Sequence, residues 1–269
     1  MMRAMASTKT IFITGSGSGF GWDTAIALAK RGHRVIATTH TDDASLKINS
    51  FAQANNLDIK SFALDVTVPE DRQKILDYDV DVLLNNAGVG ESGSLAEISL
   101  DKIRHDFEVN VFGSIALAQL ALQKFMPRDR GTILFVGSLG GRVAMPFLSS
   151  YCMTKFALSG GVDAMRQEVR RVTKNVHIGL IEPGAYHTGF NQRNIAKQFV
   201  WMDERSYFFG MKDALKKEQE NKFKMLEVRS TEGMVKQIVQ ACEAQRPKLR
   251  YTAPWWQAFG VQVLRIVGK

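Results

Sequence analysis

The amino-acid sequence predicts an α/β protein with a doubly wound parallel sheet and helices on both faces. Three observations support this fold class. Short β-branched runs alternate with longer stretches at helical spacing, as in the βαβ units of a parallel sheet. A glycine-rich turn joins the first run to the first helix, and further polar motifs follow predicted strands, where open α/β sheets bind ligands. No linker, low-complexity tract or repeat divides the 269 residues, so one domain accounts for the chain.

The expected elements alternate along the chain. Six runs predict strands, at residues 10–14, 34–38, 58–64, 81–84, 131–136 and 176–181, and a short extended piece is expected near Leu249. Helical spacing predicts helices at residues 22–31, 44–55, about 100–125, 150–173 and 232–242, with a short helix after Pro69. Gly32 ends the first helix, as a glycine just past a C-terminus commonly does.

Composition removes several classes of protein. Hydrophobic residues make up 45% and charged residues 23%, which is ordinary for a globular chain and excludes a disordered one. Two cysteines are too few for a disulfide framework or a four-ligand zinc site, and we expect no metal. No run approaches the roughly 20 apolar residues of a membrane span. Residues 1–8 lack the apolar core of a signal peptide, so we expect a disordered leader there, one domain over residues 9–269 and a cytoplasmic protein.

The net charge of +8 favours anionic partners without choosing among nucleic acid, lipid and cofactor. The basic residues are scattered along the chain, and no nucleic-acid-reading motif is present. We therefore expect a small-molecule substrate and no nucleic-acid partner.

A glycine-rich turn follows the first strand, with the sequence Thr14-Gly15-Ser16-Gly17-Ser18-Gly19-Phe20-Gly21. Glycines let backbone N–H groups approach a pyrophosphate closely, and the N-terminus of the next helix adds partial positive charge. The strand–turn–helix context favours a dinucleotide-binding turn over a tight turn without a ligand.

The end of the second strand selects between NAD and NADP. A carboxylate at this position hydrogen-bonds the adenosine ribose and repels a 2′-phosphate. The sequence has Thr39 and His40 there instead, and either side chain can bind a phosphate. We expect NADP, with NAD as the alternative in which Asp42 or Asp43 folds back onto the ribose.

Tyr151 and Lys155 are four residues apart and share one helix face. A free tyrosine has a pKa near 10, and a nearby ammonium lowers that pKa because it favours the phenolate. Such a tyrosine exchanges a proton with a carbonyl or alcohol oxygen near neutral pH. Ser138 follows the fifth strand and can hydrogen-bond the same oxygen. The pair alone is weak evidence, because a solvated helix face has the same pattern.

The motifs together resemble the short-chain dehydrogenase/reductase family. They are Thr14-Gly15-x-x-x-Gly19-x-Gly21, Asn85-Asn86-Ala87-Gly88, Asn110, Ser138, Tyr151-x-x-x-Lys155 and Pro183-Gly184, in that family's order and spacing over about residues 8–190. The resemblance implies a Rossmann-type sheet of about seven parallel strands and hydride transfer with NAD(P). The stretch at 141–148, with Phe156-Ala157-Leu158, is similar to the branch that contains steroid and retinol dehydrogenases.

The resemblance implies a role for each matching residue. Tyr151 would be the general acid/base, Lys155 would lower its pKa and hold the nicotinamide ribose, and Ser138 would orient the substrate oxygen. Asn110 would complete a proton relay through water. The expected cofactor contacts, besides Tyr151 and Lys155, are Gly15, Ser16, Gly17, Ser18, Gly19, Phe20 and Gly21 in the turn, Thr39 and His40 at the selector, Asp65, Val66, Asn86, Ala87 and Gly88 on the adenosine side, and Pro183, Gly184, Tyr186 and Thr188 at the nicotinamide.

Residues 186–229 interrupt the α/β alternation. The segment is rich in aromatic residues, methionine and lysine, and it follows a strand end. We expect a substrate lid, and the alternative is a surface helical excursion packed on its own core. Apolar residues here and at 141–148 suggest a hydrophobic substrate, with plain core packing as the alternative.

The C-terminal run at 255–267 places its tryptophans and aliphatic residues on one broad helical face. Such a helix can lie on a membrane surface, join two subunits or dock on its own domain. We expect docking on the domain, with membrane association less favoured, and a homodimer or homotetramer.

The leading hypothesis is an NAD(P)-dependent oxidoreductase that acts on the CH–OH group of a secondary alcohol or on the matching ketone. The alternative is a non-catalytic NAD(P)-binding regulatory protein on the same fold. The intact set of Ser138, Tyr151 and Lys155 disfavours the alternative, since a sensor has no need of all three.

Overall fold

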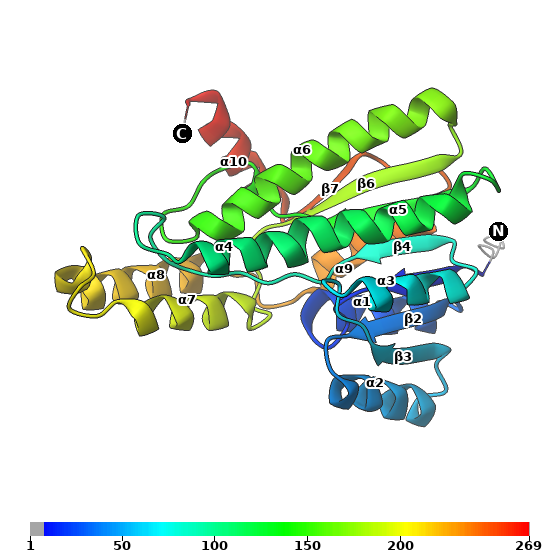
Figure 1. Ribbon diagram of the computed structural model, residues 1–269, viewed down its shortest axis with the longest axis horizontal. Coiled ribbons are helices and arrows are strands. Elements are labelled where there is room, and N and C mark those ends of the chain that lie inside the picture. Colours follow the sequence, from blue (N-terminus) through cyan, green and yellow to red (C-terminus); the bar gives the residue numbers. More distant parts are fainter. Residues whose placement is uncertain (1–7, 269) are drawn as a thin grey trace.

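Seven parallel strands form one sheet in the order β3-β2-β1-β4-β5-β6-β7 in the computed structural model (Figure 1). The structure describes residues 8–268, except for the side chains of residues 195, 198 and 201, so the leader expected at 1–8 lies outside it apart from Thr8. The strands are β1 (Thr10–Ile13), β2 (Arg34–Thr39), β3 (Ile59–Ala63), β4 (Val82–Asn85), β5 (Gly131–Val136), β6 (Val176–Pro183) and β7 (Arg250–Ala253). The strand order reverses between β1 and β4, which opens a crevice at the carboxyl edge.

Helices cover both faces of the sheet (Figure 1). One layer contains α1 (Gly19–Lys30), α2 (Asp42–Ala54) and α9 (Glu232–Glu243), and the other contains α5 (Ser114–Phe125) and α6 (Ser149–Val172), with α3 (Pro69–Gln73) and η1 (Lys74–Asp77) beside them. Side chains alternate along β1, so Ile11 and Ile13 pack in the first layer and Phe12 in the second. The strands read as continuous apolar runs because both faces are buried. The predicted fold class is confirmed.

The helix predicted over about residues 100–125 is interrupted. It consists of α4 (Leu100–Phe107), a π-helical turn η2 (Glu108–Gly113) and α5. The Ser114 hydroxyl donates to the carbonyl oxygens of Asn110 and Val111, at 2.9 and 3.0 Å, within the widened turn. Gly113 lies so close to Val66 that an added Cβ would be 2.6 Å from its carbonyl oxygen. The π-turn places Asn110 on the side that faces α6, and such turns are frequent at functional sites.

Other boundaries differ from the predictions by a few residues. Helix α1 begins at Gly19, three residues before the predicted start, because the glycine-rich turn leads directly into its first turn. Helix α2 begins at Asp42 because the Thr41 hydroxyl accepts a hydrogen bond from the Ala44 amide, at 3.4 Å. The extended piece expected near Leu249 is strand β7, which pairs with β6 at the edge of the sheet.

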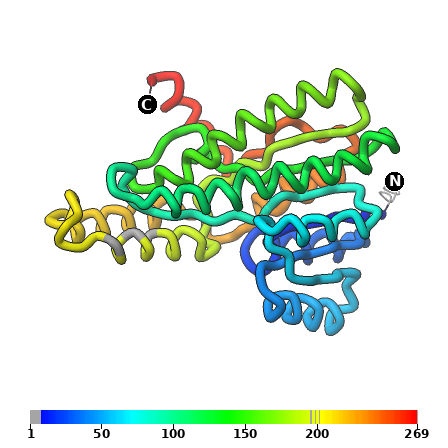
Figure 2. Tube along the Cα trace, viewed as in Figure 1, coloured from blue at the N-terminus to red at the C-terminus, as the bar shows by residue number. Residues whose placement is uncertain are grey.

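The segment at 186–229 forms a helical hairpin that projects from the body (Figure 2). Its helices are α7 (Phe190–Trp201) and α8 (Lys212–Leu226), with the short turn η4 (Phe209–Met211) between them. The base of α7 contacts the loop after β4, where an added Cβ on Gly90 would be 2.6 Å from Asn194 Nδ2. Lys197 also pairs with Glu91, at 2.7 Å. The hairpin therefore touches the carboxyl edge at its base. Its connecting turn also contacts the body, because the Ser206 hydroxyl donates to Glu97 at 2.9 Å and the Phe208 ring packs on Phe147.

Helix α10 (Trp255–Ile266) follows β7 and leaves the body at an angle (Figure 1). It contacts β7 and the short turn η3 (Leu139–Gly141), which matches the expected docking in part. None of its residues is buried, and Trp255 and Phe259 are 77% and 66% exposed. No helix within residues 8–268 is long and apolar enough to cross a membrane.

Candidate active site

The predicted site residues converge on the carboxyl edge of the sheet. The glycine-rich turn follows β1, Asn86 to Gly88 follow β4, Ser138 follows β5, and Pro183 ends β6. Tyr151 and Lys155 enter from the first turns of α6. Residues that are up to 170 positions apart in the chain therefore meet near the β1–β4 crevice, because parallel strands place all their carboxyl ends at one edge.

The glycine-rich turn is packed against the loop after β4. Gly15 has a φ of +68°, and an added Cβ would lie 2.7 Å from the Ala87 Cα. The Thr14 hydroxyl accepts hydrogen bonds from the amides of Asn86 and Ala87, both at 3.0 Å. The Asn86 carboxamide donates to the carbonyl oxygens of Thr14 and Gly15, both at 2.9 Å. Asn86 and Ala87 therefore hold the turn in place, which is a structural role beside the expected contact with the cofactor.

The N-terminus of α1 carries uncapped backbone donors. Ser18 is the N-cap residue but its side chain makes no capping hydrogen bond, and the first turn contains no acidic residue. The free N–H groups and the helix dipole together favour an anion at this point. Gly17 is exposed, and an added Cβ on Gly19 would lie 3.2 Å from Thr188. The donor set fits a pyrophosphate.

Two expected cofactor contacts in this region point into the fold instead. Ser16 is fully buried, its amide donates to Thr38 O at 2.7 Å, and its hydroxyl donates to Ile13 O at 3.3 Å. Thr39 is 1% exposed, and its hydroxyl donates to Thr41 O at 2.7 Å and lies 2.6 Å from the Ser45 hydroxyl. Each hydroxyl is engaged with a backbone oxygen of the fold, and the cofactor contacts expected of Ser16 and Thr39 stay a prediction.

At the cofactor selector His40 is the exposed side chain. It is 78% exposed, and its Nδ1 lies 3.7 Å from a carboxylate oxygen of Asp65. Burial by itself raises the pKa of Asp65. Two hydrogen bonds from Thr67 and the charge of His40 outweigh that effect and hold the pKa of Asp65 below its usual range. Val66 is buried against Gly113 and supplies shape rather than a polar group. Asp42 and Asp43 lie in the first turn of α2.

Ser138, Tyr151 and Lys155 lie together beyond β5. Ser138 caps η3, where its hydroxyl accepts a hydrogen bond from the Gly140 amide at 3.0 Å, and it also hydrogen-bonds the Tyr151 side chain. The Lys155 Nζ donates to Val136 O at 2.8 Å and lies 5.5 Å from the centroid of the Tyr151 ring. The Phe190 ring at the start of α7 packs on Tyr151, with ring centroids 5.5 Å apart. The spacing that predicted these three residues brings them to one place.

The protonation of this pair differs from the sequence expectation. Desolvation raises the pKa of Tyr151 to about 12, against a hydrogen bond from Ser138 that favours the phenolate. Desolvation lowers the pKa of Lys155 to about 8, against the charge of Asp106, which favours the ammonium. The charge of Lys155 does not contribute to the pKa of Tyr151, so the lowering that was expected from Lys155 is not seen, and the removal of water sets the direction of both shifts.

Asn110 is fully engaged in the fold. Its carboxamide oxygen accepts from the Val89 amide at 2.9 Å, and its nitrogen donates to Val89 O at 2.9 Å and to the Thr154 hydroxyl at 3.0 Å. These bonds hold the loop after β4 against α6. The proton relay expected of Asn110 stays a prediction.

At the expected nicotinamide end, Gly184 and Thr188 lie at the edge of the site and Tyr186 lies inside the fold. An added Cβ on Gly184 would lie 2.0 Å from Gln257 Oε1. Tyr186 is 3% exposed and its ring packs on Phe20, with centroids 5.2 Å apart. Tyr186 and Phe20 therefore join the base of the hairpin to α1 rather than line an open site.

Two polar groups near the site were missed by the sequence reasoning. Glu182, directly before Pro183, is completely buried and accepts from Arg142 Nε at 2.8 Å and from Arg250 Nη1 at 2.7 Å. An acid inside an apolar strand is a signal that could have drawn attention to it. Asp106 and Ser150 form the second group, with Ser150 Oγ donating to Asp106 at 2.6 Å, and no local pattern joins residues 44 positions apart.

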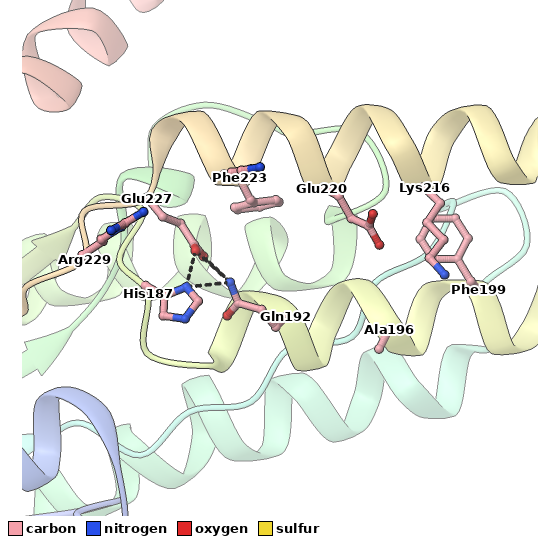
Figure 3. Close-up of a pocket in the computed structure, with 10 residues that line it drawn as sticks. His187, Gln192, Ala196, Phe199, Lys216, Glu220, Phe223, Glu227 and Arg229 are labelled. Carbon is pink, nitrogen blue, oxygen red and sulfur yellow. Dashed lines mark hydrogen bonds and ion pairs between the residues drawn. The ribbon is translucent and has the colours of Figure 1, made fainter.

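A cavity of about 750 Å³ lies between α7 and α8 (Figure 3). Its lining residues are His187, Gln192, Ala196, Phe199, Lys216, Glu220, Phe223, Lys224, Glu227 and Arg229. Glu227 accepts from His187 Nδ1 and from Gln192 Nε2, at 2.8 and 2.7 Å. Tyr151, Lys155 and Ser138 are not among the lining residues, so this cavity belongs to the hairpin and not to the catalytic group. Residues 8–268 contain no cluster of His, Cys, Asp and Glu that could hold a metal ion.

Comparisons with known proteins agree with this geometry. The sequence model of the short chain dehydrogenase family matches residues 9–198. An uncharacterized oxidoreductase of Bacillus subtilis, YusZ, is 32% identical over 224 residues, which are 79% of this chain and 78% of that protein. Human 17-beta-hydroxysteroid dehydrogenase type 1 is 29% identical over 266 residues, which are 92% of this chain and 77% of that protein.

A solved structure shows the same fold. A short chain dehydrogenase/reductase of Burkholderia phymatum in complex with NAD superposes with a TM-score of 0.79 and 20% identity, covering 98% of this chain and 95% of that chain.

Proposed function

The chain belongs to the short-chain dehydrogenase family, and on that premise we propose that it transfers a hydride between NAD(P) and a secondary alcohol or its ketone. The observation that carries the proposal is the convergence of Ser138, Tyr151 and Lys155 beside the uncapped N-terminus of α1. A phenol, an ammonium and a hydroxyl around one point can bind and protonate a carbonyl oxygen.

The cofactor would bind along the carboxyl edge. The first turn of α1 would hold the pyrophosphate, with Gly17 and Gly19 leaving room for close approach. Thr188 and Gly184 would border the nicotinamide end. When bound, the nicotinamide supplies or accepts the hydride.

In the proposed reaction Tyr151 moves the proton. During ketone reduction its hydroxyl donates a proton to the carbonyl oxygen, while the Ser138 hydroxyl hydrogen-bonds that oxygen. The resulting phenolate is held by the Lys155 ammonium, which is present below pH 8 because desolvation lowers the pKa of Lys155 to about that value. In alcohol oxidation the phenolate takes the proton back. The raised pKa of Tyr151, about 12, makes the acid form dominant at neutral pH and suits the reductive direction.

We propose a hydrophobic substrate and a lid function for the hairpin. Aromatic side chains support this proposal, since the Phe190 ring packs on Tyr151 and the Phe147 ring, just before α6, packs on Phe208 with centroids 5.2 Å apart. The relative named a hydroxysteroid dehydrogenase supports an apolar alcohol or ketone of this class. The contact of Phe208 from the hairpin with Phe147 beside η3 supports closure of residues 186–229 over the substrate.

For the cofactor we propose NADP over NAD. His40 is the exposed basic group at the end of β2, and its pairing with Asp65 directs it toward the expected adenosine side. We also propose that the protein is cytoplasmic. We further propose that it self-associates, because Phe112, Met153 and Phe156 are exposed apolar residues on the neighbouring elements η2 and α6.

Cofactor titration followed by turnover tests the proposal. NADPH and NADH are titrated into the pure protein by fluorescence, and an apolar ketone panel is then assayed with the cofactor that binds more tightly. We expect tighter binding of NADPH and turnover of at least one apolar ketone, and His40→Ala should reduce the preference for NADPH. Cofactor binding without turnover of any ketone or alcohol would favour the regulatory alternative.

A further inference from the structure

Helix α4 and the π-helical turn η2 that continues it meet α6 along a line of polar side chains, which we call the α4–α6 seam. Asp106 and Asn110 lie four residues apart on one side, and Ser150 and Thr154 lie four residues apart on the other. Ser150 Oγ donates to Asp106 Oδ2 at 2.6 Å, and Asn110 Nδ2 donates to Thr154 Oγ1 at 3.0 Å. All four side chains are buried, with exposures of 0 or 1%. The seam consists of two hydrogen bonds in matching register.

The seam fixes the part of α6 that carries the proposed chemistry. Ser150 and Thr154 directly precede Tyr151 and Lys155 in the chain, so each hydrogen bond of the seam anchors the backbone beside one of these two residues. The same side chains hold the loop after β4. Asp106 accepts from the Glu91 amide at 3.1 Å, and Asn110 bonds both polar backbone atoms of Val89.

Asp106 is more than a hydrogen-bond acceptor in this seam. Its Oδ1 is buried and has no hydrogen-bond partner among the described residues, which is costly for a carboxyl group. The charged and titratable groups around it are Lys155 from α6, Glu91 from the loop and His105 from its own helix. Glu91 already pairs with Lys197 and Lys102, at 2.7 and 3.4 Å, and the charge of His105 favours the ionised carboxyl of Asp106. Burial raises the pKa of Asp106 against the hydrogen bonds from Ser150 and the Glu91 amide, and the charge of Asp106 in turn favours the ammonium of Lys155.

We propose that Asp106 is a positioning residue for the hydride transfer proposed above: its carboxylate anchors Ser150 and Glu91 around Tyr151, and its charge keeps Lys155 in the ammonium form. The inference rests on the proposed function for its role in turnover. The anchoring and the charge are separable, because Ser150→Ala removes the hydrogen bond and keeps the charge, whereas Asp106→Asn removes the charge at nearly constant shape.

The direction of the charge effect follows from the sign of the interaction. Desolvation already lowers the pKa of Lys155 to about 8, and the charge of Asp106 opposes that lowering. Removing the charge should lower the pKa of Lys155 further, and we expect a decrease of about one pH unit, at the low end of the effect of an opposite charge. The alkaline limb of kcat/KM for ketone reduction should then move to lower pH by the same amount.

The experiment measures two quantities in the full-length protein. The first is the NMR titration of the Lys155 side chain in protein labelled with 13C-lysine, assigned by comparison with Lys155→Met. The second is the pH profile of kcat and kcat/KM. The variants are Asp106→Asn and Ser150→Ala, and the matched control is Asp101→Asn, an exposed aspartate on the same helix. Thermal melting checks that each variant is folded.

We expect Asp106→Asn to lower the Lys155 titration and the alkaline limb by about one pH unit, and kcat at pH 8 by about tenfold. Ser150→Ala should lower kcat several-fold with an unchanged titration, and Asp101→Asn should resemble wild type. If Lys155 has the same pKa in folded Asp106→Asn as in the wild type, the charge role is overturned. If Ser150→Ala has the kcat of the wild type, the anchoring role is overturned, and this test holds even when Asp106→Asn does not fold. If the wild type turns over nothing, the proposed function fails, and the Lys155 titration still decides the electrostatic role of Asp106.

Discussion

The carboxyl edge of the sheet and the α7–α8 hairpin are built in different ways. At the edge, each site loop is held by several short hydrogen bonds from other loops, such as those between Thr14, Asn86 and Ala87. In the hairpin, one carboxylate, Glu227, gathers His187, Asn191 and Gln192, and the rest of the cavity is lined by charged and aromatic side chains. Many hydrogen bonds from several loops therefore fix the carboxyl edge, whereas a single carboxylate holds the base of the hairpin.

The largest loss of activity should result from a substitution at the carboxyl edge of the sheet. Tyr151→Phe removes the proton donor and keeps the ring contact with Phe190, so kcat should fall by roughly 100- to 10,000-fold. The dissociation constant of the cofactor should change little. Steady-state assays with fluorescence titration measure both, and near-normal turnover would contradict the assignment of Tyr151.

The glycine-rich turn should be the part of the edge least tolerant of added volume. Gly15→Ala places a Cβ 2.7 Å from the Ala87 backbone at a φ of +68°. We expect a loss of about 1–3 kcal/mol in the free energy of unfolding, together with loss of cofactor binding. Gly17→Ala is the matched control, because its Cβ would have no neighbour closer than 3.7 Å. Urea unfolding of both variants tests this, and equal stabilities would contradict the packing argument.

Burial of Lys155 should make stability depend on pH. Its pKa is lowered to about 8 in the folded protein from 10.5, so between pH 8 and 10 the unfolded chain binds more protons and stability rises with pH. Above pH 10 the raised pKa of Tyr151 acts in the opposite direction, because the folded protein then binds more protons.

The rise from Lys155 should amount to about 2 kcal/mol and should be absent in Lys155→Met. Urea unfolding of the cofactor-free protein at pH 7.5 and 9.5 measures it. Lys47→Met, on the exposed surface of α2, is the control and should keep the wild-type rise. If the stability of Lys155→Met rises with pH as much as that of the wild type, groups other than Lys155 cause the rise.

The smallest effect on stability should come from the hairpin. Glu227→Ala removes the acceptor for three side chains and should cost about 1–2 kcal/mol while raising the KM of an apolar substrate several-fold. The affinity for the cofactor should stay within twofold. Glu220→Ala is the control, since Glu220 lines the same cavity, is exposed and has no ion-pair or hydrogen-bond partner in the described part of the chain. A KM equal to that of wild type in Glu227→Ala would argue against a lid.

The sequence predicted those parts of the molecule whose determinants are local. Six of the seven strands follow from runs rich in β-branched residues, whereas β7 was expected only as a short extended piece near Leu249. Ser138, Tyr151 and Lys155 follow from spacing within one helix and one strand end. The inward orientation of Ser16 and Thr39 was not predicted. Each hydroxyl binds a backbone oxygen only two or three residues away, and every residue carries such an oxygen, so no residue type signals the contact.

Long-range pairings were also beyond a single sequence. The packing of α4 on α6 brings Asp106 and Ser150 together, and the residues around either position do not predict this pairing. The π-turn at 108–113 has the same origin, because Gly113 must pass close to Val66 O. The direction of the Tyr151 pKa shift was predicted wrongly for a related reason. The shift arises from burial of the side chain in the folded protein, and the sequence around Tyr151 does not show that burial.

The carboxamide of Gln257 connects three distant parts of the chain. Its oxygen accepts from the Ala185 amide at 2.7 Å, and its nitrogen donates to Leu226 O at 2.8 Å. Gln257 therefore spans both ends of the hairpin, one strand-end loop before α7 and the last turn of α8. An outward movement of the hairpin would have to stretch at least one of these two hydrogen bonds, so Gln257 ties α10 to both ends of the hairpin. A force on Trp255, at the exposed start of α10, would therefore reach these two hydrogen bonds at the base of the hairpin first.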